Sequence, residues 1–414
     1  MLGPVKGNNG CAEGHGTERP TGSRVPIPIK SGNRMQTIVH VLPYMAHGGT
    51  EKHVLTLLRR LRKDYDLILM APRGEILDEF LRLDITYVEF KTPGLGRAGA
   101  RFGKRLKEIH EDRGVDAVHV HAAHEYVSFS KRSLPHVPVL FHLSAHQGSV
   151  VSRFLNYRLS ASIARRKAAG LIAVSEEEAR IIVSHGYPED KVSVIYNGYE
   201  ADEGTDDAAV DKLKKEYGLE GCVVVGNLGR LNKTKRLDLL IEAFAAIKGE
   251  APLPLKLLIA GEGPEKENLR LLAQKRGIGK DAAFPGFIRR GDRILGLFDV
   301  FVLPTTHEGC SNVLVEAMAK GLPILTTNIP SVSWMFEDEK SGLLFNKNDL
   351  AGLKEKLVLL VEDPSRRAEL GRGASARFAE AFTAEKMARS VDSLYRSILK
   401  RGSPPGSGKP DRTQ

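Results

Sequence analysis

The sequence has few cysteines and no long apolar run. Its three cysteines, Cys11, Cys222 and Cys310, are scattered through 414 residues, which excludes a disulfide framework and a cysteine-based zinc site and favours a reducing compartment. No apolar stretch approaches the roughly 20 residues that a membrane-spanning helix needs. The N-terminus lacks the basic segment and apolar core of a signal peptide. We therefore expect a cytoplasmic protein.

Acidic residues are missing from two parts of a chain whose formal net charge is +10. Residues 126–175 contain seven Lys or Arg and no Asp or Glu, and a second acid-free cluster extends from Arg97 to Lys107. Basic patches attract polyanions, such as anionic lipid headgroups. We do not expect nucleic acid as the partner, because no known nucleic-acid module is present and aromatic residues are not interleaved with the basic runs. A basic surface without a ligand is the alternative.

Apolar strands alternate with amphipathic helical patterns along most of the chain. Short apolar runs such as 37–42, 67–70, 117–120 and 137–143 are separated by helical stretches, and a second series begins at 222–228. This alternation predicts βαβ units and parallel sheets. We predict an α/β protein with two Rossmann-like domains facing across a cleft. The predicted parts are a disordered tail (1–34), an N-terminal domain (35–196), a connection (197–220), a C-terminal domain (221–382), a C-terminal helix (383–401) and a second disordered tail (402–414).

Two glutamates stand out in the C-terminal half. Glu308 and Glu316 follow the apolar strand 300–304, and Glu316 lies about one turn inside a predicted helix for which Ser311 or Asn312 is the N-cap. Free backbone N–H groups and the helix dipole make such strand–loop–helix junctions suitable for phosphates. A sugar nucleotide supplies both a diphosphate and hydroxyl groups for the acids. Solvated surface acids are the alternative interpretation.

Other segments that follow strands add cations and glycines. The loop 226–236 contains Arg230 and Lys235, which could grip a diphosphate. Gly261-Glu262-Gly263-Pro264 is typical of a tight turn before a helix.

In this order and spacing, these segments resemble the retaining group 1 glycosyltransferases with the GT-B fold. The resemblance covers roughly residues 36–400 and rests on the Glu308-x7-Glu316 pattern, Arg230 with Lys235, the turn 261–264, Gly48-Gly49-Thr50-Glu51 and Ile195-Tyr-Asn-Gly198. The chain departs from the family after Asn328, where Ile329-Pro-Ser replaces the usual Gly-Gly-x-Glu type of loop.

The resemblance implies a set of site residues. Arg230 and Lys235 would neutralise the leaving diphosphate, Glu316 would bind the ribose diol, and Glu308 would contact hydroxyls of the donor sugar. The remaining residues implied to hold the donor are Gly48, Gly49, Glu262, Gly309, Cys310, Ser311 and Asn312.

A histidine of the first domain is also expected near the sugar. His146, before Gln147-Gly148, is the preferred candidate, with His142 as the second choice. Metal binding by His119, His121 and His124 is conceivable, but no acid-rich spacing supports it. We expect no metal ligands and no cofactor other than the nucleotide-sugar donor.

The predicted function is transfer of a sugar from a nucleotide-sugar to a glycan or lipid-linked acceptor in cell-envelope polysaccharide or lipopolysaccharide synthesis. Apolar and basic residues at helical spacing in 153–169 lead to the hypothesis of peripheral contact with an anionic membrane at its inner face. A nucleotide-sugar epimerase and a non-catalytic polyanion-binding module are the alternatives.

Overall fold

The computed structural model describes residues 34–90, 97–144, 150–201, 207–249, 253–288 and 291–402. The two predicted tails, 1–34 and 402–414, fall outside these ranges except for Arg34 and Gly402. Among the described residues, no helix is both long and apolar enough to cross a membrane.

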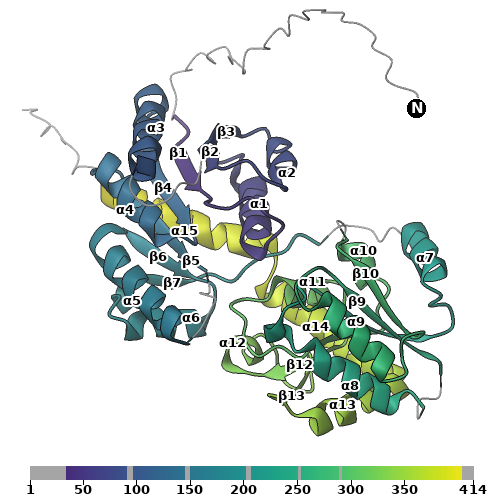
Figure 1. Ribbon diagram of the computed structural model, residues 1–414. Coiled ribbons are helices and arrows are strands. Elements are labelled where there is room, and N and C mark those ends of the chain that lie inside the picture. Colours follow the sequence, from purple (N-terminus) through teal and green to yellow (C-terminus); the bar gives the residue numbers. More distant parts are fainter. Residues whose placement is uncertain are drawn as a thin grey trace, which may run out of the picture. The chain divides into compact units, whose positions relative to one another are not determined.

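The first half of the chain builds a parallel sheet with the order β3-β2-β1-β4-β5-β6-β7 (Figure 1). Its strands are β1 (Thr37–Val41), β2 (Asp66–Ala71), β3 (Thr86–Glu89), β4 (Val115–His121), β5 (Val139–Leu143), β6 (Gly170–Ala173) and β7 (Val192–Val194). The intervening helices are α1 (Gly49–Leu61), α2 (Leu77–Leu81), α3 (Arg97–Arg113), α4 (His124–Ser133), α5 (Val150–Lys167), α6 (Glu176–Ser184) and the short 3-10 helix η1 (Glu189–Lys191).

The second half builds another parallel sheet, in the order β10-β9-β8-β11-β12-β13. Its strands are β8 (Val223–Leu228), β9 (Leu255–Ala260), β10 (Ala282–Gly286), β11 (Val300–Leu303), β12 (Ile324–Asn328) and β13 (Leu343–Asn346). The helices are α7 (Asp207–Glu216), η2 (Lys233–Lys235), α8 (Leu237–Ile247), α9 (Lys266–Lys275), α10 (Gly291–Leu295), α11 (Asn312–Ala319), α12 (Pro330–Ser333), α13 (Leu350–Glu362), α14 (Pro364–Ala381) and α15 (Ala384–Gly402).

Apolar residues cover both faces of the first sheet because successive side chains of a strand point to opposite faces. Val39 and Val41 of β1 belong to the core under α3 to α6. Ile38 and Leu42 belong to the core under α1, α2 and α15. Both faces are buried, as expected for a parallel sheet that is covered by crossover helices.

Each sheet reverses its strand order at one point, between β1 and β4 in the first sheet and between β8 and β11 in the second. The loops that follow these strands diverge there, and open α/β sheets bind ligands in the resulting crevice. The predicted site loops 229–236 and 304–311 follow β8 and β11, so the topology brings them together.

The chain passes between the two halves twice, and these two connecting segments are hydrogen-bonded to each other. The Tyr199 N–H donates to the Phe382 carbonyl at 2.9 Å, and the Ala384 N–H donates to the Tyr199 carbonyl at 2.9 Å. Beyond this bridge, α15 returns to the first half and packs against α1. The Tyr65 hydroxyl donates to Asp392 on α15 at 2.6 Å, so the C-terminal helix completes the first lobe.

Candidate active site

An ion pair lies at the point where the second sheet reverses its strand order. Lys235, from the loop after β8, pairs with Glu308, from the loop after β11. The two side chains are only 15% and 12% exposed. Thr305 donates its hydroxyl to the same Glu308 oxygen at 2.9 Å. A cation and a carboxylate that the sequence placed 73 positions apart are therefore in direct contact, as expected for two site residues.

The loop around Glu308 is held by a segment that departs from the family pattern. Ser331 of α12 accepts a hydrogen bond from the Glu308 N–H at 3.3 Å.

Burial raises the pKa of the neighbouring Cys310 thiol to about 12, so Cys310 stays protonated and is not a nucleophile at neutral pH.

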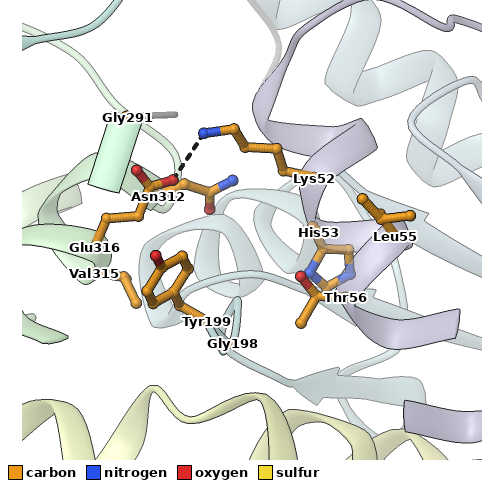
Figure 2. A pocket seen from close by; sticks show the side chains of 10 residues that line it. All are labelled: Lys52, His53, Leu55, Thr56, Gly198, Tyr199, Gly291, Asn312, Val315 and Glu316. Carbon is orange, nitrogen blue, oxygen red and sulfur yellow. Dashed lines mark hydrogen bonds and ion pairs between the residues drawn. The ribbon is translucent and has the colours of Figure 1, made fainter. Parts of the chain in front are cut away.

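A cavity of about 150 Å³ lies between α1 and α11 (Figure 2). Lys52 and His53 of α1 line it on one side, and Asn312 and Glu316 of α11 on the other. Lys52 Nζ lies 3.0 Å from Glu316 Oε1, and the Glu316 side chain is 7% exposed whereas that of Lys52 is 50% exposed. The predicted acid Glu316 thus faces a cavity and is paired with a half-exposed cation from the first lobe.

Asn312 connects the start of α11 to the first lobe. Its amide nitrogen donates to the Gly49 carbonyl at 2.8 Å, and its amide oxygen accepts from Asn197 at 2.8 Å. Ser311 occupies the N-cap position but its side chain makes no capping hydrogen bond. The Leu314 N–H of the first helical turn already donates to the Ser311 carbonyl at 3.0 Å. The N–H groups of Asn312 and Val313 precede it and have no intrahelical acceptor, so they are the ones available to an anion.

The predicted turn 261–264 has a structural role. A Cβ on Gly261 would lie 1.8 Å from the Gly229 carbonyl oxygen, and one on Gly263 would lie 2.2 Å from the Leu231 carbonyl oxygen. Only glycine permits this approach, and both residues have positive φ, +136° and +158°. The turn therefore supports the loop that presents Lys235.

Two residues implied by the resemblance lie apart from these contacts. Glu262 pairs with Lys266 at 2.7 Å on the exposed start of α9. Arg230 is exposed and does not line the cavity between α1 and α11. Gly48 precedes α1 as its N-cap, and Gly309 lies in the loop between Glu308 and Ser311.

Of the two histidine candidates near the sugar, His146 lies outside the described residues. His142 is buried in β5 at 2% exposure, which is typical of a core residue, and its ring centroid lies 4.5 Å from that of His53. Among the described residues, His53 lines the cavity between α1 and α11, and sequence reasoning missed it.

Lys52, Asn197 and Thr305 were also missed. Lys52 directly follows Gly48-Gly49-Thr50-Glu51, so its place in the first turn of α1 could have pointed to it. Thr305 carried no signal in the sequence, and Asn197 was noticed only as part of the Ile195-Tyr-Asn-Gly198 pattern, because both roles depend on packing between distant segments.

Comparisons with known proteins identify the family and the fold. Residues 192–377 match the family described as Glycosyl transferases group 1, and residues 47–203 match Glycosyltransferase Family 4. The crystal structure of Anabaena HepE in complex with UDP and glucose is similar, with a TM-score of 0.77 and 20% identity, covering 88% of this chain and all of HepE. The chain belongs to the group 1 glycosyltransferases and has the GT-B fold, as predicted.

Two relatives are similar in sequence. The lipopolysaccharide core biosynthesis glycosyltransferase LpsE of Rhizobium meliloti is 30% identical over 46% of this chain and 53% of its own length. The Campylobacter jejuni N-acetylgalactosamine-N,N'-diacetylbacillosaminyl-diphospho-undecaprenol 4-alpha-N-acetylgalactosaminyltransferase is 25% identical over 86% of this chain and 98% of its own length. The chain spans about half the length of the first of these relatives.

Proposed function

We propose that this protein is a retaining glycosyltransferase that moves a hexose-type sugar from a nucleotide-sugar to a glycan or lipid-linked acceptor. The observation that supports this most directly is the Lys235–Glu308 pair at the strand-order reversal of the second sheet. Such a crevice is where α/β sheets bind nucleotides. The cavity beside Glu316 is open to a second group of the same ligand.

The charges of the site residues support a different role in the reaction for each of them. Breaking the bond between the anomeric carbon and the diphosphate leaves negative charge on the phosphate and positive charge on the sugar ring. Lys235 and the free N–H groups at the start of α11 would stabilise the departing diphosphate. Glu308 would bind sugar hydroxyls, and Glu316 would exchange Lys52 for the ribose diol. We propose that this step needs neither a metal nor a cofactor at the diphosphate, and that the acceptor attacks from the face that the diphosphate leaves.

The acceptor is proposed from the relatives. By its name, the Campylobacter jejuni relative acts on a diphospho-undecaprenol glycan, and the Rhizobium relative acts in lipopolysaccharide core biosynthesis. We infer that this chain extends a lipid-linked or core glycan of the cell envelope.

The surface of α5 supports contact with an anionic membrane. Val151, Phe154, Leu155 and Leu159 are 69%, 51%, 57% and 49% exposed, although apolar side chains of this size are usually buried. Exposed arginines such as Arg158 alternate with them. This combination suits the interface of an anionic bilayer, at the cytoplasmic face where we expect the protein to act.

A sedimentation assay tests this contact. Wild-type protein should bind vesicles of phosphatidylglycerol and phosphatidylcholine in a salt-sensitive manner, and Phe154→Ser with Leu155→Ser should not. Leu271→Ser is the matched control, because Leu271 is equally exposed, at 50%, on α9. Equal binding by all variants would reject α5 as the contact.

The transferase proposal is tested by two measurements on the same protein. A thermal-shift screen against UDP-, GDP- and ADP-sugars should identify one nucleotide class. Consumption of that donor is then followed with and without a lipid-linked glycan acceptor. Turnover that requires the acceptor supports the proposal, conversion of the donor alone identifies an epimerase, and binding without consumption identifies a non-catalytic module.

A further inference from the structure

Five histidines gather on one face of the first sheet. His40 lies on β1, His119 and His121 on β4, His142 on β5 and His53 on α1. Each is at most 3% exposed. Register explains the cluster, because His40 pairs with His119 and His121 pairs with His142. Alternate residues of a strand share a face, so the strand histidines all point toward α1 and α15.

Three of these histidines converge on one point. His53, His121 and His142 each offer a ring nitrogen, and these atoms all lie within 4.8 Å of one another. Ligand nitrogens bound at 2.0–2.1 Å around a tetrahedral zinc ion lie about 3.3 Å apart. Small side-chain adjustments would therefore close the three rings around an ion.

The same three residues have ring nitrogens that lack partners. His53 Nδ1 and Nε2, His121 Nδ1 and His142 Nδ1 are buried without a hydrogen bond among the described residues. An unsatisfied buried polar atom destabilises a protein, so a cluster of them points to a ligand.

An outer layer of hydrogen bonds orients one of the three rings. His121 Nε2 lies 3.1 Å from His40 Nδ1, and His40 Nε2 lies 3.2 Å from the Tyr395 hydroxyl of α15. Metal-bound histidines characteristically use their second nitrogen in this way. The arrangement leaves His121 Nδ1 without a hydrogen-bond partner among the described residues.

We propose that His53, His121 and His142 form a site for a divalent transition-metal ion of the zinc type. The ligand set of imidazoles without a carboxylate suits zinc, cobalt, nickel or copper and does not suit magnesium, calcium or manganese. His53 lies in the wall of the cavity between α1 and α11 (Figure 2), which gives the ion an entry path. The site is separate from the proposed sugar transfer and does not rest on it.

Such an ion would have a positioning role. It would tie α1 to β4 and β5, and α1 begins at Gly49 and presents Lys52, both of which contact α11. Sequence reasoning expected no metal ligands, because no acid-rich spacing supported His119, His121 and His124. His40 and His53 lie far from these residues along the chain. Strand register brings His40 beside His119, and the packing of α1 brings His53 beside His142.

The test measures metal content of the full-length chain with any affinity tag removed. Cells are grown with added zinc, and the purified protein is assayed by mass spectrometry of its metals. Wild type should contain close to one zinc ion per chain, His53→Asn should lose it, and His119→Asn should retain it. His119 is the matched control, because it is equally buried in the same cluster but lies outside the proposed ligand set.

Each result bears on the proposal. Wild-type protein without bound transition metal, as expected if ordered water fills the cluster, would overturn it. Loss of zinc from His119→Asn and not from His53→Asn would also overturn it, in favour of the neighbouring trio His40, His119 and His121.

A second measurement uses only wild-type protein and therefore tests the proposal even if a variant fails to fold. Metal-depleted wild type is titrated with cobalt chloride and followed by visible absorption and by thermal unfolding. We expect the absorption bands of tetrahedral cobalt and a higher Tm, both reversed by a chelator. Cobalt without either effect would reject the site.

Discussion

Replacing Lys235 with methionine separates the contribution of the Lys235–Glu308 pair to stability from its contribution to catalysis. Methionine keeps most of the side-chain length and removes the charge, so Glu308 is left as a carboxylate that is 12% exposed. Breaking a fully buried pair costs about 3–5 kcal/mol. Thr305 still donates to Glu308 at 2.9 Å and some solvent reaches the carboxylate, so we expect a loss of about 1–3 kcal/mol in stability.

The expected loss of activity is larger. A preorganised donor aimed at developing charge typically contributes a factor of about 10²–10³ in kcat. We therefore expect Lys235→Met to lower kcat by about that factor, measured as release of nucleoside diphosphate from the donor that the screen identifies. The double variant Lys235→Met/Glu308→Gln removes both charges. It should recover stability, measured by denaturant unfolding, without recovering the rate.

Two outcomes would refute this reasoning. A kcat for Lys235→Met within about threefold of wild type would show that Lys235 does not act on the diphosphate, given the factor expected. Recovery of the rate in the double variant would show that Lys235 only neutralises Glu308. Glu308→Gln alone is the control for the loss of sugar contacts.

Three further predictions concern separate features. Glu316→Gln should weaken binding of the matching free nucleoside diphosphate by about 10-fold or more, because a hydrogen bond to a charged group is lost, whereas Lys52→Met should not weaken it. Calorimetry measures both affinities, and equal values for wild type and both variants would contradict the role of Glu316. Burial raises the pKa of Glu178 to about 7, above its ordinary value, because it favours the protonated carboxyl. The contribution of the protonated Glu178 to folding stability is therefore fully present below about pH 4.5 and is lost as pH rises through 7. The lost free energy is roughly 3 kcal/mol, and Tm measured from pH 5 to 8 should therefore fall more steeply for wild type than for Glu178→Gln; parallel curves would rule this out. Gly261→Ala should lower stability by about 2 kcal/mol or more through its positive φ and its contact with the Gly229 carbonyl, and an unchanged denaturant midpoint would refute the close approach.

The sequence was sufficient for the architecture because strand and helix patterns are local. The predicted runs 37–42 and 222–228 coincide with β1 and β8 to within one residue at one end, and the predicted order of alternating elements holds through both sheets. The site loops were also predictable, since each follows a strand and parallel strands end at the same edge of a sheet. Glu308 and Lys235 met as that reasoning required.

Contacts that depend on packing were not predictable. Lys52 and Glu316 are 264 positions apart, and no local pattern indicates that α1 faces α11. The histidines show the same limit: His124, which sequence reasoning grouped with His119 and His121, is bonded instead to Ser160 at 3.0 Å. His40 and His53 replace it, because register and helix packing decide which residues share a face.

The bridge between Tyr199 and Thr383 fastens the two segments that connect the lobes to each other at one place. If the protein works as the proposed transferase, we expect the lobes to hinge about this bridge, so that the crevice between them widens most at the end remote from it. Substitutions at the bridge would then change the rate of product release before they changed the chemistry.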